Sequence, residues 1–469
     1  MSTATFTTIS TLIDQEKKKN SSFFKEYKGY QEDDITYAYT ASEARKKALP
    51  VSKMPPLFNE PTTFQNFHQH INWIQSILLI ATPLIGIYGC FTTTLNYKTL
   101  YWSIVYYFIT GLGITAGYHR YWSHRSYSAT FITQIFLLLA GSGAVQGSIR
   151  WWSRGHRAHH RWTDTDKDPY AATRGFFFSH IGWMLVKRPK SRIGYADVSD
   201  LQKDQLVQFQ HRYYPWFALL MGFFFPTLVA GLGWNDYKGG FFYASVCRLV
   251  FVHHATFCVN SLAHYIGETT FDDFHTPKDH WLTAFVTCGE GYHNFHHEFP
   301  QDYRNAIIWY QYDPTKWLIR TLSFFGLTYN MKTFPSNEIK KGQYQMEEKR
   351  IYNKKKNLTY GTAIQCLPIY TWDEFQHQVS KKGQKWTAIE GIIYDLKDFD
   401  HPGGMNYLKS GFGKDMTTAF NGGIYNHSNG ARHLLTSKRV GILKYGMEVM
   451  RDRPEIPVYD INLEPKKSK

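Results

Sequence analysis

The chain has 469 residues, which is enough for more than one domain. Lysine and arginine outnumber aspartate and glutamate by 53 to 38, and the formal charge of +15 suits nucleic acid, an anionic membrane face or a phosphate-bearing substrate. Five scattered cysteines without a CxxC pair argue against a disulfide framework and a cysteine-ligated zinc site.

The first part of the chain, residues 1–64, is a polar arm marked by Pro50, Pro55 and Pro56. We expect this arm to be largely irregular, and we expect no cleavable signal peptide because no apolar run precedes residue 70. Apolar runs then follow at 72–95, 100–118, 131–148, 216–235 and 240–262. A bilayer core needs about 20 apolar residues per helix, which four of these runs supply. Membrane spans favour a lipid surface or a phosphate-bearing substrate over nucleic acid as the partner.

Histidines gather in three short windows at the ends of these runs. The windows are HRYWSH at 119–124, HRAHH at 156–160 and HNFHH at 293–297, and they hold eight of the 21 histidines. In the second and third windows the histidines stand at i, i+3 and i+4, on one face of a helix. Imidazole is a common metal ligand, and eight imidazoles are too many for one ion, so the windows predict a two-metal centre.

The first window has a different spacing. His119 and His124 are five residues apart, about 140° around an ideal α-helix, and so cannot share one helical face. We therefore expect His124 to lie in a turn just beyond the helix that carries His119. His264, at the end of the last apolar run, faces the same zone, and its position leaves its role as a ninth ligand open.

The run at 131–148 is interrupted by three glycines and is interpreted as a short re-entrant or interfacial helix. An odd number of crossings between the first two windows would place their histidines on opposite sides of the membrane. Four spans in two hairpins place all three windows on one side, together with the lysine-rich segments. By the positive-inside rule, that side and both termini are predicted to be cytosolic.

Neutral imidazoles without nearby thiolates fit an oxygen-activating di-iron site better than a structural zinc site. Such a site could remove hydrogen from an unactivated carbon. Carboxylates beside the windows are candidates to orient the imidazole N–H groups, and these are Asp164, Asp166, Asp168, Glu290 and Glu298.

The C-terminal part begins with a charged linker at 336–364, predicted to be helical only in part. Residues 365–447 are predicted to form a compact domain, and 448–469 a basic polar tail that ends in KKSK. Within the domain, an apolar strand precedes His401 in HPGG, and His427 follows 26 residues later. This pattern resembles the cytochrome b5 haem-binding domain, which implies a small α+β fold and haem b held by both histidines for electron transfer.

Residues 65–335 resemble the membrane acyl-CoA desaturases that insert the delta-9 double bond, through GITAGYHRYWSH, RGHRAHHRWTDTDKDPY, NSLAHYIG and EGYHNFHHEFPQDYR. A fused cytochrome b5 domain is the arrangement of the fungal-type enzymes. The resemblance implies a mainly α fold with a four-span di-iron domain, and iron ligands at His119, His124, His156, His159, His160, His264, His293, His296 and His297. It also implies that Asn260 holds a water near one iron.

The resemblance further implies the reaction. Electrons from NADH would pass through a cytochrome b5 reductase and the haem to two irons that use O2 to desaturate an acyl-CoA. Basic side chains on the cytosolic side are candidates to bind the CoA phosphates, namely Arg150, Arg154, Lys187, Arg188 and Lys190. Gly155 stands where animal members carry an acidic residue that helps to bind CoA, so that contact is not expected here. Tyr106, Tyr107 and Phe108 are candidates for the closed end of the acyl tunnel.

Two other functions stay open. A fatty-acyl or sterol hydroxylase also uses clustered histidines, although its first window usually has a shorter HxxxH spacing. A b5-type membrane electron carrier would need neither four spans nor a second metal site. KKSK resembles the dilysine retrieval signal of endoplasmic-reticulum membrane proteins, and this localisation is our expectation. A homodimer, and the choice between palmitoyl and stearoyl chains, are left open by the sequence.

Overall fold

The computed structural model describes residues 56–58 and 60–444 of the chain. The chain divides into two compact units, with the division between Glu347 and Glu348. Most of the predicted N-terminal arm and the tail with its KKSK end lie outside the described residues. Each unit is described by itself below.

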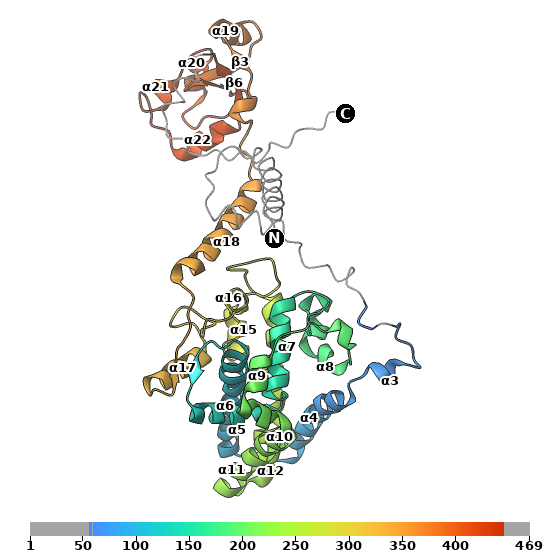
Figure 1. The fold of residues 1–469 in the computed structure, drawn as a ribbon. Coiled ribbons are helices and arrows are strands. Elements are labelled where there is room, and N and C mark those ends of the chain that lie inside the picture. The colour runs from blue at the N-terminus through green and yellow to red at the C-terminus, as the bar shows by residue number, and fades with distance from the viewer. Residues whose placement is uncertain (1–55, 59, 445–469) are drawn as a thin grey trace, which may run out of the picture. The chain divides into compact units, whose positions relative to one another are not determined.

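The first unit contains four helices that are long and apolar enough to cross a membrane, which confirms the four predicted spans (Figure 1). The first is α4 (Trp73–Thr92), and the second joins α5 (Tyr97–Leu112) to the π-helical η2 (Gly113–Ser123). The third runs through α10 (Gln205–Leu219), η6 (Leu220–Phe224) and α11 (Phe225–Trp234). The fourth runs through α12 (Tyr237–Gly239), η7 (Gly240–Cys247), α13 (Arg248–Asn260) and α14 (Leu262–Tyr265).

The connections within the two hairpins lie next to each other. Thr99 donates from its hydroxyl to Asp236 Oδ2 at 2.5 Å and accepts from Trp234 Nε1 at 2.8 Å. Asn96 begins α5 by accepting from Lys98 N at 2.9 Å. Both connections therefore lie at the same end of the bundle, as two parallel hairpins require.

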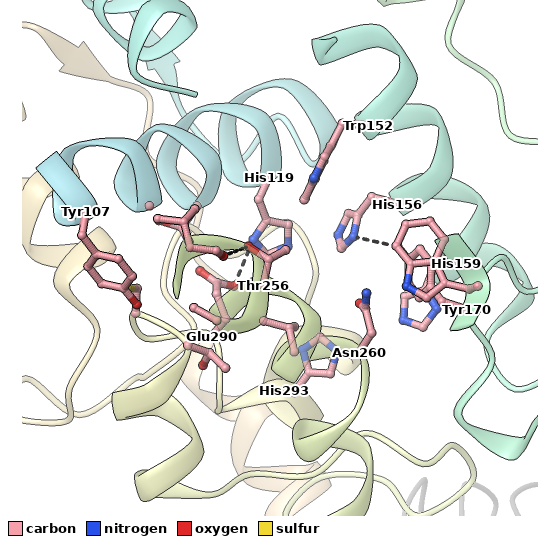
Figure 2. A pocket seen from close by; sticks show the side chains of 18 residues that line it. Tyr107, His119, Trp152, His156, His159, Tyr170, Thr256, Asn260, Glu290 and His293 are labelled. Atoms are coloured by element: carbon pink, nitrogen blue, oxygen red, sulfur yellow. Dashed lines mark hydrogen bonds and ion pairs between the residues drawn. The ribbon is translucent and has the colours of Figure 1, made fainter. Parts of the chain in front are cut away.

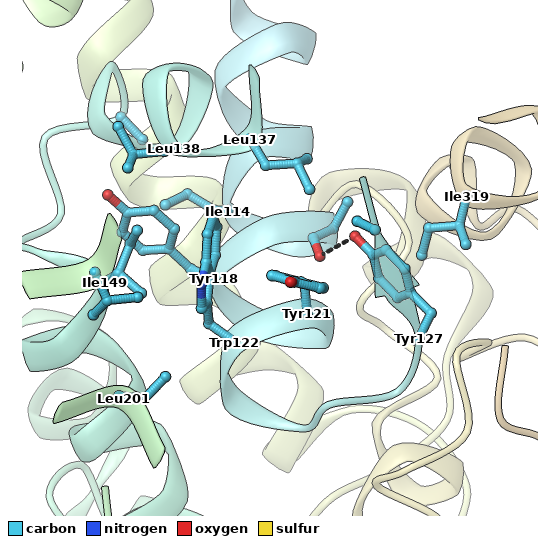
Figure 3. Packing of buried hydrophobic residues seen from close by; sticks show 14 of the residues in the cluster. Ile114, Tyr118, Tyr121, Trp122, Tyr127, Leu137, Leu138, Ile149, Leu201 and Ile319 are labelled. Carbon is cyan, nitrogen blue, oxygen red and sulfur yellow. Dashed lines mark hydrogen bonds between the residues drawn. The ribbon is translucent and has the colours of Figure 1, made fainter. Parts of the chain in front are cut away.

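The interrupted apolar run folds as α6 (Phe131–Ser142), whose 12 residues are too few to span a bilayer. This helix packs closely against η2, because Gly113 and Gly141 leave no side chains between the two backbones. The core beside this contact is formed by large side chains from η2, α6 and α7 (Ile149–Trp162), among them Tyr118, Trp122, Leu137 and Ile149 (Figure 3). The end of the second span is thereby held rigidly.

Short elements complete the first unit. They are α3 (Phe67–His70), η3 (Ala172–Arg174), η4 (Phe178–Gly182), α8 (Trp183–Leu185), η5 (Lys190–Arg192), α9 (Ser199–Lys203), α15 (Trp281–Val286), α16 (His293–Glu298) and α17 (Pro314–Phe324). Strands β1 (Ser128–Ala129) and β2 (Thr328–Tyr329) pair in antiparallel fashion. Of these elements, α15 and α16 lie near α7 (Figure 1).

Most of the segment 336–364, which was predicted to be a charged linker with partial helix, forms one helix, α18 (Ser336–Lys356), so the helix is longer than expected. Its sequence is rich in glutamate, glutamine and lysine, which are strong helix formers. Ile339 and Met346, seven residues apart, are both buried on one stripe, and Ile339 packs with Phe271 and Phe295. Charge made this segment resemble a linker, whereas two buried side chains tie it to the first unit.

The second unit holds a four-stranded sheet in the order β3-β6-β5-β4, with β3 and β6 parallel and the other pairs antiparallel. The strands are β3 (Ile369–Tyr370), β4 (Trp386–Ile389), β5 (Ile392–Asp395) and β6 (Arg439–Leu443). The helices are η8 (Ile364–Cys366), α19 (Trp372–Ser380), α20 (Met405–Gly411), α21 (Thr417–Phe420) and α22 (Asn429–Thr436). Alternate residues of β5 enter different cores, with Ile393 packing on Phe375 and Ile392 packing near Phe420.

The close approach of η2 and α6 predicts a large cost for any side chain at Gly113. A Cβ added there would lie 2.3 Å from Gly141 N and 2.5 Å from the carbonyl carbon of Ala140. We expect Gly113→Ala to lower the melting temperature of the detergent-purified protein, because backbone atoms cannot move aside. The control Gly233→Ala adds a methyl group where nothing lies within 4 Å, and its melting temperature should not fall. Equal melting temperatures for the two variants would contradict this packing.

Candidate metal centre

The structure brings the nine predicted histidine ligands together in two groups. Five of them form one group, namely His119, His124, His156, His160 and His296, and four form the other, namely His159, His264, His293 and His297. Within each group the ligand atoms lie within 4.8 Å of one another. Each of the helices α7 and α16 contributes histidines to both groups, so the two groups share their walls.

The spacing of the first window is explained by a π-helix. Residues 113–123 are π-helical, and the backbone N–H of His124 donates to the carbonyl of His119, five residues earlier, at 3.1 Å. Residues five apart therefore stand on one side of the backbone, and the two rings lie 4.9 Å apart. His124 follows the helix, as predicted, but the argument from α-helical geometry that the two could not share a face was wrong.

The imidazoles turn their Nε2 atoms toward one another. His119 and His296 have Nε2 atoms 3.0 Å apart, and the Nε2 atoms of His124 and His156 are 2.7 Å apart. In the second group, His297 Nε2 lies 3.2 Å from that of His159 and 3.1 Å from that of His293. Converging nitrogens of this kind need either a shared proton at each contact or a cation between them.

The partners of the outer nitrogen in two of these rings favour a cation. His159 Nδ1 lies 2.9 Å from Asp168 Oδ1, and His119 Nδ1 lies 3.0 Å from Glu290 Oε2. A carboxylate only accepts, so each Nδ1 carries a proton, and a ring with that one proton presents a lone pair at Nε2. The lone pairs therefore point inward, as a bound cation requires.

His264 reaches its carboxylate through a hydroxyl. Its Nδ1 lies 2.7 Å from Thr276 Oγ1, and that hydroxyl donates to Asp164 Oδ1 at 2.7 Å. Because its one proton is used on Asp164, Thr276 must accept from His264 Nδ1. The Nε2 atom of His264 is buried without a hydrogen-bond partner, and it faces the second group. This orphaned atom fits a metal ligand and supports His264 as the ninth.

A buried ion-pair network supports the first group. Arg120 donates to Glu290 Oε1 at 2.9 Å and to both oxygens of Asp313, at 2.9 and 3.0 Å. Burial alone would raise the pKa of Glu290, but Arg120 and His119 together lower it to about 2. Glu290 is thus ionised and holds His119 as an acceptor throughout the neutral range. Sequence reasoning missed Arg120, although it lies within the first histidine window.

Burial also favours the neutral form of four of the imidazoles. It lowers the pKa of His156, His160, His296 and His297 well below the usual histidine value, and neighbouring imidazoles lower it further.

Two further contacts support the helix and the rings of the site. Asp279 Oδ1 caps α16 by accepting from Asn294 N at 2.9 Å, and Tyr170 OH lies 3.5 Å from His156 Nδ1. Neither Asp279 nor Thr276 has a sequence signal beyond its residue type.

The other predicted carboxylates are placed differently. Asp166 is half-buried and accepts from Arg188 through its backbone carbonyl, and Glu298 is exposed at the end of α16. Asn260 lies beside His159 and His293, where it could hold a water toward the second group (Figure 2).

An elongated pocket begins at this centre. His119, His156 and His293 line one part of it, and it extends along α5 to Tyr107 and Cys288, whose side chains are 3.5 Å apart (Figure 2). Tyr106, the residue before Tyr107 in α5, instead donates to Met221 O at 2.5 Å and packs against Arg248. Of the two tyrosines proposed for substrate contact, only Tyr107 lines this pocket.

The predicted phosphate-binding residues fall into two kinds. Arg154, Lys187 and Lys190 are exposed, and Arg150 is half-buried with Nη1 3.3 Å from Gln208 Oε1. Arg188 is different, because its guanidinium is directed into the protein and binds backbone carbonyls.

In the second unit, His401 and His427 face each other with ring centroids 6.0 Å apart. His427 donates from Nδ1 to Phe420 O at 3.0 Å, which leaves its Nε2 free for a metal. At Gly403 an added Cβ would lie 2.9 Å from the His401 ring, so the HPGG turn needs glycine there. The two rings, with apolar side chains such as Phe399 and Phe412 around the core, fit a haem group held from both sides.

Comparison with known proteins gives the following matches. Residues 97–333 match the fatty acid desaturase family, and residues 371–444 match the cytochrome b5-like heme/steroid binding domain. The "Probable acyl-CoA desaturase" of Schizosaccharomyces pombe is 51% identical over 416 residues, covering 86% of each chain. Acyl-CoA desaturase 1 of Saccharomyces cerevisiae is 46% identical over 82% of this chain and 76% of its own. A Delta(9)-fatty-acid desaturase of Caenorhabditis elegans is 41% identical over 57% of this chain and 81% of its own.

The contact between Asp168 and His159 predicts a metal-specific effect of Asp168→Asn. An amide can present its N–H to Nδ1 and so favour the wrong tautomer, and we expect iron affinity at one site to fall about 10–100-fold. Non-haem iron per purified protein, measured by elemental analysis against haem, checks this. The control Asp166→Asn leaves the backbone carbonyl in place and should keep the full iron content. Unchanged iron in Asp168→Asn would contradict the assigned role.

Proposed function

Because this chain belongs to the fatty acid desaturase family and carries a cytochrome b5-like domain, we propose that it is an acyl-CoA desaturase that inserts a delta-9 double bond. The proposed substrate is a saturated fatty acyl-CoA, and the electrons come from NADH through a cytochrome b5 reductase. A relative from Caenorhabditis elegans named for delta-9 activity supports the position of the bond.

The observation that carries the proposal is the convergence of nine imidazoles beside an apolar pocket. Two irons bound there would supply O2 activation and the removal of hydrogen from an unactivated methylene. Imidazoles anchored by Glu290, Asp168 and Thr276 keep their lone pairs fixed toward the ions. A site with thiolates and no adjoining pocket would instead suggest structural zinc.

The pocket orients an acyl chain and excludes water from the reacting carbons. Val252, Ala255 and Val259 give the α13 side of the pocket an apolar lining. Near the centre, Gln146 Nε2 donates to Thr256 Oγ1 at 2.8 Å, and Trp152 Nε1 donates to Gln146 Oε1 at 3.4 Å. These bonds hold the pocket wall at a fixed place relative to the metal ligands. Which methylenes react then follows from how far the chain enters, by positioning alone.

The exposed residues Arg154, Lys187 and Lys190 and the half-buried Arg150 are proposed to bind the CoA phosphates. The cytochrome b5-like domain is proposed to pass electrons from its haem to the di-iron centre. His401 and His427 would hold that haem, and a haem held by two histidines would supply electron transfer instead of O2 binding. From the resemblance of KKSK to a dilysine retrieval signal we propose that the enzyme lies in the endoplasmic-reticulum membrane, and from the positive-inside rule we propose that both termini are cytosolic.

Product analysis tests the proposal. Membranes containing the protein would receive palmitoyl- or stearoyl-CoA, NADH and O2, and mass spectrometry would locate any new double bond. We expect a delta-9 monoene that is lost in His296→Ala, because His296 is a buried ligand of the first group. A hydroxylated product would support a hydroxylase instead. Haem iron without further iron in the wild-type protein would support an electron carrier.

The position of Tyr107 generates a second prediction. Tyr107→Ala removes the ring at the far end of the pocket and should shift preference toward longer acyl chains, because the chain can then enter further. The control Phe108→Ala changes a neighbouring side chain that is 37% exposed on the surface of the span, and its preference should not change. Competition between acyl-CoA substrates of different length measures both. An unchanged preference in Tyr107→Ala would contradict the proposed tunnel end.

A further inference from the structure

Arg188 stands in a basic segment but does not present its charge to the surface. Its Nη1 donates to the carbonyls of Asp168 and Pro169 at 2.7 and 3.1 Å, and its Nη2 donates to those of Asp166 and Arg192, both at 2.6 Å. The remaining donor, Nε, is buried. All four terminal N–H groups are therefore used on backbone carbonyls, and none remains for a phosphate.

Three of the four carbonyls belong to the loop that follows the second histidine window, 164–170. This loop holds the two carboxylates behind the four-histidine group. Asp168 accepts from His159 Nδ1 at 2.9 Å, and Asp164 accepts from Thr276, which in turn accepts from His264 Nδ1. A movement of the loop would therefore displace the supports of two ligands together.

The loop also needs external support. Asp164 has a φ of +63°, in the left-handed region that side chains other than glycine seldom adopt. Asp168 Oδ2 accepts from Asp164 N at 3.0 Å, so the two carboxylate residues are linked to each other. Arg188 closes the loop from the opposite side, where three carbonyls point in one direction and would repel one another without a cation.

The five-histidine group depends on other supports. His119 is held by Glu290, which Arg120 binds. Among the described residues, the loop contacts that group through Tyr170, whose OH lies 3.5 Å from His156 Nδ1, a longer distance than the 2.9 Å between Asp168 and His159. Arg188 is thus coupled mainly to one of the two groups.

We propose that Arg188 is a positioning residue that holds the loop 164–170 and thereby the ligands His159 and His264 of the four-histidine metal site. It is therefore not an anchor for CoA phosphates, unlike its exposed neighbour Lys187. This inference rests on the proposed function, since it assumes that each histidine group holds one iron. A lysine at this position has a compact ammonium with three donors and cannot span all four carbonyls.

The test compares Arg188→Gln, Arg188→Lys and Lys187→Gln with the wild-type protein, each as the full chain purified after growth on ⁵⁷Fe. Mössbauer spectroscopy counts and distinguishes the non-haem irons, and steady-state assays give kcat and KM for acyl-CoA. We expect Arg188→Gln to lose iron from one site, with affinity about 10–100-fold weaker there, and to lose kcat with KM unchanged. Added Fe²⁺ should restore part of that activity, and Arg188→Lys should lie between Arg188→Gln and the wild type.

Lys187→Gln is the matched control, because it removes a neighbouring positive charge that is exposed. It should keep both irons and raise KM. A raised KM with both irons retained in Arg188→Gln would identify Arg188 as a phosphate anchor and overturn the inference. Equal loss of both irons with a lowered melting temperature would show a general folding role and also overturn it. If Arg188→Gln does not accumulate, Arg188→Lys decides by the same criteria. A wild-type protein without two non-haem irons would overturn the proposed function itself.

Discussion

Nine converging imidazoles, six of them buried and three half-buried, are the constraint on which the rest of the molecule depends. Buried acceptors that face acceptors are costly, and an unsatisfied buried polar group costs about 1–3 kcal/mol. A cation bound between the rings would offset this cost, and His119, His159 and His264 are each held from behind at Nδ1. Metal binding and folding are therefore coupled in this part of the chain.

The surrounding structure provides that support at short range. Glu290 accepts from His119 Nδ1, and Asp168 accepts from His159 Nδ1. Thr276 accepts from His264 Nδ1 and donates to Asp164. Behind these lies a second set of charges, with Arg120 on one side and Arg188 on the other. The two metal groups share helices α7 and α16 but have separate outer supports. This separation is what allows one group to be perturbed without the other.

Much of this architecture could be predicted from the sequence, because hydrophobic length and histidine spacing are local signals. The four spans, the short helix at 131–142 and the haem pair His401 and His427 follow from such patterns. The π-helix at 113–123 could not be predicted from α-helical geometry, although the five-residue spacing of the two histidines matches the hydrogen-bond spacing of a π-helix. Thr276 and Arg188 act through contacts between distant segments, which composition and periodicity do not encode. The length of helix α18 was not predicted, because its high charge indicated a linker and only two of its apolar side chains are buried.

The central claim is that the two histidine groups each hold one iron beside the acyl pocket. Anomalous scattering measured at the iron edge, from crystals of the full chain grown under reducing conditions, tests it most directly. The account predicts two non-haem iron peaks, one among His119, His124, His156, His160 and His296 and the other among His159, His264, His293 and His297. A single peak at this centre, or peaks outside these groups, would contradict it.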